Sequence, residues 1–237
     1  MNYRHAPGFG RTSLVVGAAL LATAATTFAA ASTSATTAPK RLVGTFLITK
    51  GTNVRGAPHG SYFRMVDPGG STTKGKFFSN PDSRAINKTF TLISPGTAGG
   101  LKTGSFQPAP STAFDAKGDS RAKSIILPTN FTGINFSVAT ESTDAQTKIK
   151  VSAPSITVLK GKLSGDLRAF AANWNNLSFN QGSPKPNGTR PGLTAPVTGT
   201  YNAKTHAYVL TWASEIIGGP FNDFTGVWHL TGTFRAK

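Results

Sequence analysis

Cysteine is absent from this chain of 237 residues. Thiolate catalysis, iron–sulfur clusters and cysteine-ligated zinc are therefore excluded, because each of them needs a sulfur ligand. No disulfide can form either, so the fold must be stabilised by an apolar core rather than by cross-links. The chain is long enough to bury such a core as one large β domain or two small ones.

Acidic residues are scarce, since nine Asp and Glu stand against 25 Lys and Arg. Loss of Arg4 and Arg11 with the leader described below would leave 23 basic and nine acidic residues, and hence a net charge of +14. A surface this basic attracts polyanions, although the charge could instead serve solubility alone. The basic residues are scattered and no nucleic-acid recognition module is visible, so no specific nucleic-acid partner is predicted.

A long apolar run is missing except near the start of the chain. Arg4 and Arg11 precede an Ala-rich apolar core over residues 13–27, and an Ala-x-Ala sequence follows at 29–31. This order is typical of a secretory signal peptide, which we expect to span residues 1–31, with cleavage as late as Ala35 as the other option. A retained anchor is the alternative, but the run is short and no stop-transfer cluster follows. We therefore expect a secreted or cell-wall-associated bacterial protein with no integral membrane segment after cleavage.

Helical periodicity is also missing after the leader. Residues 32–40 read as a polar tether, and residues 41–237 show short apolar runs divided by Gly, Pro, Asn and Ser. This texture predicts an all-β fold, a single antiparallel β-sandwich or flattened β-barrel domain. Residues 166–175 fit helical spacing, but the alternation that leads into them favours a strand. The Pro- and Gly-rich segment 181–196 predicts a long surface loop inside the domain.

The clearest strand pattern lies at the C-terminal side of the chain. Large apolar residues alternate with mostly polar ones from Phe224 to Arg235, as expected for a half-buried strand, and residues 206–213 precede it as its hairpin partner. Phe46 and Phe234 follow Gly-Thr in the first and last strands, so we expect these strands to lie close together. Other strands are predicted over residues 42–48, 61–66, 89–93, 134–139 and 155–159.

Three stretches carry a resemblance to known proteins. Residues 60–70, 180–186 and 218–229 resemble exported proteins of actinobacterial type that have no assigned activity. The resemblance implies an exported single domain. It carries over no functional residues.

Familiar catalytic signatures are missing, including the Gly-x-Ser-x-Gly elbow, the Walker loop and His-Glu-x-x-His. Among the carboxylates only Glu215 and Asp223 flank one apolar loop, where they could act as the pair of a glycosidase. The alternative is that Asp223 forms a turn through its backbone. His206 and His229 could meet a metal from adjacent strands, but strand histidines are more often surface or hydrogen-bonded residues. We predict no catalytic residues, no metal site and no cofactor.

Aromatic and amide side chains are densest around Trp174. Flat rings offer apolar faces to sugars, and amides offer paired donors and acceptors to hydroxyl groups. We therefore predict ligand-binding roles for Asn173, Trp174 and Asn176, with Lys185 and Arg190 adding a preference for anions. The alternative is that Trp174 is a core anchor at a strand end and the Asn residues form the turn.

Taken together, export, positive charge and missing catalytic signatures predict a non-catalytic secreted or cell-envelope protein. Its expected partner is an anionic or sugar-rich extracellular polymer. One alternative is a carbohydrate-active hydrolase of the envelope that uses Glu215 and Asp223. Another is a structural or protein-interaction protein whose polar loops bind a protein partner.

Overall fold

Seventeen strands and no helix make up residues 38–237, the range that the computed structural model describes. The all-β prediction is therefore confirmed. The predicted signal peptide, residues 1–31, lies outside this range, as does most of the tether. Among residues 38–237 there is no helix that is long and apolar enough to cross a membrane.

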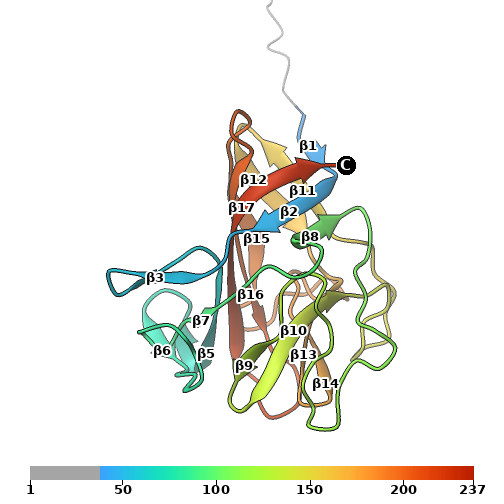
Figure 1. The fold of residues 1–237 in the computed structure, drawn as a ribbon. Coiled ribbons are helices and arrows are strands. Elements are labelled where there is room, and N and C mark those ends of the chain that lie inside the picture. The colour runs from blue at the N-terminus through green and yellow to red at the C-terminus, as the bar shows by residue number, and fades with distance from the viewer. Residues whose placement is uncertain (1–37) are drawn as a thin grey trace, which may run out of the picture. The chain divides into compact units, whose positions relative to one another are not determined.

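The larger of the sheets has eleven antiparallel strands (Figure 1). These strands are β1 (Lys40–Leu42), β2 (Gly44–Ile48), β5 (Tyr62–Ser71), β6 (Gly75–Phe77), β7 (Thr91–Leu92), β8 (Gly100–Thr103), β11 (Ser155–Leu159), β12 (Lys162–Asp166), β15 (Ala195–Tyr201), β16 (Ala207–Glu215) and β17 (Thr225–Ala236). The main path runs β1-β11-β12-β15-β16-β17-β2-β8, and β5 adds β6 and β7 beside β17.

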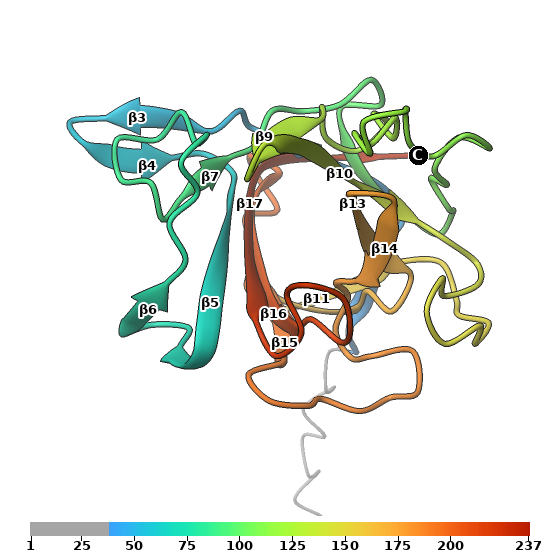
Figure 2. The same ribbon diagram turned by 90° about the horizontal axis from the view of Figure 1, so that it is seen from below.

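A smaller sheet closes the open side of this curve. It contains β9 (Thr129–Phe131), β10 (Ile134–Thr140), β13 (Phe170–Trp174) and β14 (Leu177–Asn180), in the order β14-β13-β10-β9. Figure 2 shows the two sheets enclosing a common interior, as in a nearly closed barrel or sandwich. A separate hairpin, β3 (Thr52–Val54) with β4 (Ala57–His59), lies to one side. Residues 166–175 thus hold a strand rather than a helix, as predicted.

Strand β17 organises the larger sheet. One edge pairs with β16 from Thr225–Glu215 to Thr233–Ala207, which confirms the predicted hairpin. The other edge pairs first with β5 and then, from Gly232 onward, with β2. Phe234 lies directly opposite Phe46, so the first and last predicted strands are paired.

The change of partner along β17 has a local cause at two small residues. A Cβ at Gly232 would overlap the backbone oxygen of Leu47, so only glycine allows β2 to approach there. One residue earlier, the Ser61 hydroxyl accepts a hydrogen bond from the Thr231 N–H at 3.0 Å and lies 3.2 Å from the Thr231 carbonyl oxygen. A side chain therefore satisfies the backbone where the ladder is interrupted.

Aromatic rings join the two sheets. Trp212 and Trp228 stack at 5.8 Å, and Phe170 of the smaller sheet meets both rings edge-on at 5.1 and 5.0 Å. Both indole N–H groups donate to Gln181, Trp212 to its carbonyl oxygen and Trp228 to its side-chain oxygen. Burying two indoles requires such acceptors, because an unpaired buried N–H is costly.

The predicted surface loop over 181–196 is confirmed only in its middle, where residues 187–190 are exposed. Gln181, Ser183 and Lys185 are buried, and strand β15 begins at Ala195. An irregular segment can be buried when its polar groups find partners, and this one bonds to strand β16 through Ser214, whose hydroxyl donates to the Gly182 carbonyl at 2.7 Å. The Pro- and Gly-rich composition predicts that this segment is irregular, but it does not reveal the hydrogen-bond partners on β16 that allow it to be buried.

Candidate functional site

Trp174, the centre of the predicted sugar site, lies between the sheets rather than on an open face. Its Nε1 donates to the Phe131 carbonyl at 2.9 Å, and its ring packs on Phe221 at 5.2 Å between centroids. The ring lines a small apolar cavity of about 40 Å³. Asn175 and Asn176, with φ of 50° and 60°, form the turn into β14. This geometry matches the core-anchor alternative.

The amides near Trp174 have different surroundings. Asn173 is only 2% exposed, and its side-chain oxygen accepts a hydrogen bond from the Ser178 hydroxyl at 2.6 Å. Asn176 and Arg190 are exposed. Sugar binding through these two residues stays a prediction, whereas the placement of Asn173 does not fit a direct contact with a polymer.

Lys185 is buried, with 5% of its surface exposed. Its ammonium donates to the Asn180 carbonyl at 2.9 Å, to the Ser214 hydroxyl at 2.8 Å and to the Glu215 carbonyl. Burial lowers the pKa of Lys185 to about 8, an effect that the negative charges of Glu215 and Asp144 partly oppose. The Lys185 ammonium, which the sequence analysis assigned to an anionic ligand, is therefore already hydrogen-bonded to three protein acceptors.

The candidate carboxylate pair occupies two distinct environments. Glu215 ends β16 and lies against Gly192, where a Cβ would overlap its carboxylate. Asp223 is exposed at a left-handed position with φ of 68°, and its N–H donates to the Ile216 carbonyl. Asp is favoured in this conformation, as the turn alternative predicts.

Most other carboxylates stabilise loops. Asp119 accepts hydrogen bonds from both the backbone and the side-chain N–H groups of Asn135, and Asp144 accepts three from Gln146 and Thr147. Backbone N–H groups likewise donate to Asp82, Asp115, Glu141 and Asp166. In residues 38–237 the only ion pair joins Arg168 to Asp166. Most of the few carboxylates thus accept hydrogen bonds from the main chain. Within residues 38–237, the basic side chains other than Arg168 therefore have no carboxylate partner.

The two strand histidines lie apart. His229 stacks on Tyr62 with centroids 4.5 Å apart, and burial lowers its pKa. His206 is an exposed turn residue whose Nδ1 lies 2.8 Å from the Tyr201 hydroxyl. No cluster of three His, Asp or Glu side chains suited to a metal occurs in the described range.

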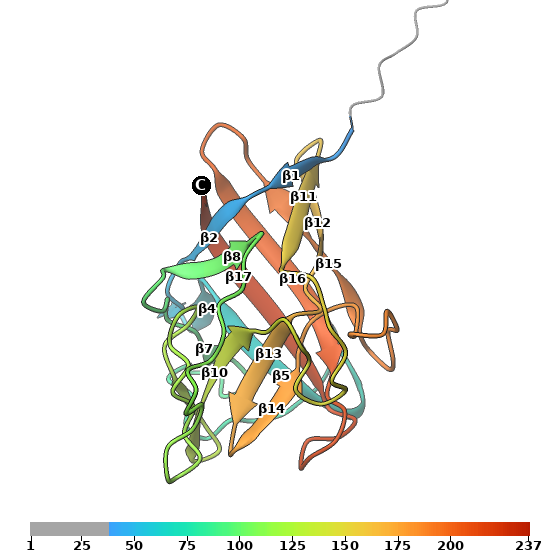
Figure 3. The same cartoon turned by 90° about the vertical axis from the view of Figure 1, so that its right-hand side faces the viewer.

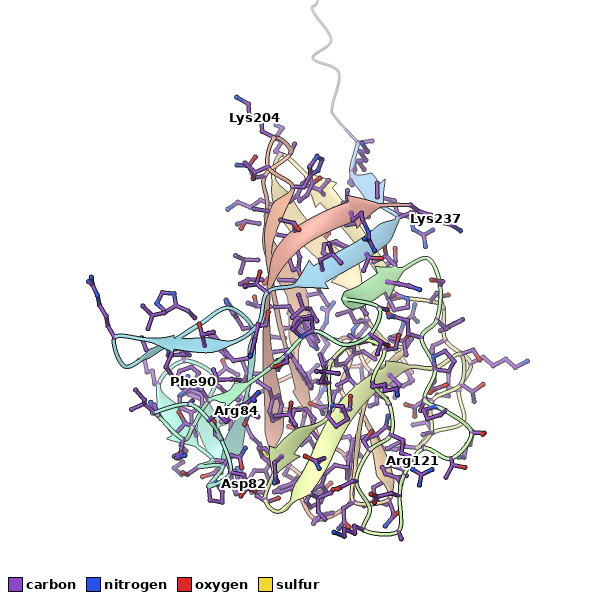
Figure 4. All side chains as sticks on the ribbon, in the orientation of Figure 1. Asp82, Arg84, Phe90, Arg121, Lys204 and Lys237 are labelled. Carbon is purple, nitrogen blue, oxygen red and sulfur yellow. The ribbon has the colours of Figure 1, made fainter. Side chains whose placement is uncertain are left out.

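Exposed basic residues gather at one end of the barrel, which we call the cationic end. Its members are Lys40, Arg41, Lys102, Lys160, Lys162, Lys204, Arg235 and Lys237, all of them exposed. Lys204 and Lys237 mark this end at the top of Figure 4, and Figure 3 shows β1 and the β11–β12 hairpin there as well.

Strand pairing explains why these residues meet. Lys40 pairs with Val158 next to the β11–β12 turn, and Lys162 pairs with Thr200 next to the β15–β16 turn that holds Lys204. Across the sheet, Arg235 and Lys102 both pair with Thr45. Sequence reasoning missed this cluster because its members come from five separate segments.

Acidic residues are absent from those five segments, which are residues 38–48, 100–105, 155–163, 198–210 and 230–237. All nine carboxylates belong to other parts of the chain, such as the opposite ends of β12 and β16, where Asp166 and Glu215 lie. The five segments of the cationic end therefore carry eight basic side chains and no acidic one. Such a field attracts anions over distances near the Debye length.

Comparisons of the chain with protein-family models, with curated proteins and with solved structures found no match.

Proposed function

We propose that this is a non-catalytic exported protein that binds an anionic extracellular polymer through its cationic end. The observation that supports it is the gathering of eight exposed basic side chains at one end of the barrel, with no acidic residue in the segments that form it. Export is proposed from the leader pattern in residues 1–31, and the cell wall of a bacterium is the proposed location.

The placement of the remaining cations strengthens the proposal. Several basic residues outside the cationic end have evident structural partners; for example, Lys185 is buried among acceptors, Arg168 is paired with Asp166, and Arg64 lies between the rings of Phe77 and Phe90. The eight side chains of the cationic end are exposed, and none of them takes part in the ion pair of residues 38–237. Close like charges cost stability, so a surface that keeps them together is better suited to an anionic partner than to solubility alone.

Charge reversal at this end gives the direct test. In residues 32–237, we expect Lys160→Glu, Lys162→Glu and Lys204→Glu together to weaken retention on purified cell wall about tenfold or more, because each lysine near an anionic surface contributes about 1 kcal/mol. The measurement is retention on cell wall and on insoluble neutral and acidic polysaccharides across a salt series.

The control carries the same change of charge at exposed lysines outside the cationic end. Lys74→Glu, Lys117→Glu and Lys150→Glu together should weaken binding much less. Equal losses in the two triple variants would mean that net charge alone acts, and the proposed end would be wrong. Tight binding to a neutral polysaccharide would instead favour a sugar site of the kind first predicted around Trp174.

A further inference from the structure

A surface hollow of about 330 Å³ lies within the cationic end, where β2 runs between β17 and β8. Gly44 and Thr45 of β2 help to line it, the flanking strands contribute Lys102 and Arg235, and Lys237 follows the end of β17. Among the exposed basic residues of this end, these three are the ones that line the hollow. Its volume falls at the lower end of the range of small-molecule sites.

The cations of the hollow are arranged by strand register. Arg235 and Lys102 are the cross-strand partners of Thr45 on its two sides. Residues in one such row share a face of the sheet, and neighbouring strands lie about 4.8 Å apart, so the two basic residues start about 10 Å from each other. Lys237 lies two residues beyond Arg235 and shares its face. Long side chains from β8 and from the end of β17 therefore line the hollow on either side of Thr45.

The backbone around the hollow is firmly held. The Lys102 N–H donates to the side-chain oxygen of Gln107 at 2.7 Å, and the amide nitrogen of Gln107 donates to the Gly100 carbonyl at 2.9 Å. On the other wall the Lys237 N–H donates to the Val43 carbonyl at 3.2 Å. Gln107 is buried and thus acts as a positioning residue for Lys102. A site with a fixed backbone needs less ordering when its ligand binds.

We propose that this hollow binds a phosphate group of a phosphodiester-linked polymer, with Arg235, Lys102 and Lys237 as the charged contacts. This inference rests on the proposed function and names the chemistry of its ligand. A phosphate presents acceptor oxygens in three dimensions, whereas a carboxylate presents its lone pairs in one plane. Donors reach the hollow from both walls, and the hydroxyls of Thr45 and Ser105 add two more from β2 and the residues after β8. This distribution suits a tetrahedral oxyanion, and the guanidinium fork of Arg235 can bind two of its oxygens.

The test compares two double variants that lose the same charge within the cationic end. Lys102→Gln with Arg235→Gln removes two contacts of the hollow, while Lys160→Gln with Lys204→Gln removes two cations outside it. All four side chains are exposed, so neither pair should disturb folding. For a soluble glycerol-phosphate polymer, we expect both pairs to weaken binding, and the first pair to do so at least about tenfold more than the second, because only the first also removes contacts of the hollow.

A polyglutamate of matched charge and length tests the choice of phosphate, and wild-type protein should bind it several times more weakly. Equal binding of the two polymers would overturn the assignment to phosphate, and equal losses in the two double variants would overturn the hollow. If wild-type protein bound no anionic polymer, the proposed function would fail. The hollow would then be tested by titrating the protein with inorganic phosphate and, separately, with acetate. Changes in the NMR chemical shifts of Thr45 and Lys102 with phosphate alone would support a phosphate site in the hollow, and no changes would refute it.

Discussion

Replacement of Trp228 by alanine is expected to lower the free energy of unfolding by about 4 kcal/mol, the usual cost of deleting a fully buried large aromatic ring. Trp228 is 1% exposed and contacts four rings, those of Phe63 at 4.7 Å, Phe170 at 5.0 Å, Trp212 at 5.8 Å and Phe136 at 6.3 Å. The substitution would leave a void between the two sheets. It would also take the hydrogen-bond donor away from the buried side-chain oxygen of Gln181.

Urea denaturation of residues 32–237 measures this loss as a shift of the midpoint at constant slope. Trp228→Phe separates the two causes, because it keeps most of the ring contacts but loses the indole N–H, and we expect it to cost about 1–2 kcal/mol. Val227→Ala is the neighbouring control, since Val227 points to the other face of β17 and is only half-buried. A loss below about 1 kcal/mol for Trp228→Ala would contradict the assignment of Trp228 to the junction of the sheets.

The sequence predicted this strand well for a simple physical reason. A strand with one face in the core alternates large apolar and polar residues, and Trp228, Leu230 and Phe234 follow that alternation without interruption. The strands around Phe46 and Phe136 were found in the same way. Short edge strands such as β1 and β6 were missed, because three residues are too few to show a period. The longer strand β15 was missed as well, because it begins inside the segment 181–196 that was predicted to be a loop.

Properties that depend on strand order could not be predicted. The row of Arg235, Thr45 and Lys102 joins residues far apart in sequence, and it exists only because β2 lies between β17 and β8. The placement of Trp174 could not be predicted on related grounds, and its role in sugar binding stays a prediction. An aromatic residue beside amides looks the same in the sequence whether its ring faces solvent or is packed inside the fold. In the structure the indole N–H of Trp174 donates to the Phe131 carbonyl across the smaller sheet.

The burial of Lys185 could not be predicted from the sequence, because lysine is almost never fully buried and two prolines flank this residue in an apparent loop. The structure shows why burial is tolerated. Its ammonium has three donors, and it donates to two carbonyl oxygens and one hydroxyl, so every proton meets an acceptor. The cation thereby ties the 180–185 segment to the end of β16 without a carboxylate partner.

This arrangement predicts that stability rises with pH above neutrality. The folded pKa of Lys185, about 8, lies below its ordinary value of 10.5, so between these values the unfolded chain holds more protons than the folded one. The free energy of unfolding must then increase with pH, and the rise should reach about 2 kcal/mol between pH 7.5 and 9.5. Burial raises the pKa of Tyr62 and Tyr208, which acts in the opposite direction only as unfolded tyrosine ionises near pH 10, so the window closes below that value.

Lys185→Met tests the source of the rise, because it keeps the length of the side chain and removes the titrating group. Between pH 7.5 and 9.5 the urea midpoint should increase for the natural protein and change little for the variant, whatever the stability of the variant at pH 7.5. Lys150→Met is the matched control, as Lys150 is exposed, and it should climb like the natural protein. If the Lys185 variant climbed as well, another group would be responsible. If the urea midpoint rose with pH for none of the proteins, the pKa of Lys185 would be the same in the folded and unfolded chains. The three acceptors around the ammonium would then compensate fully for its burial.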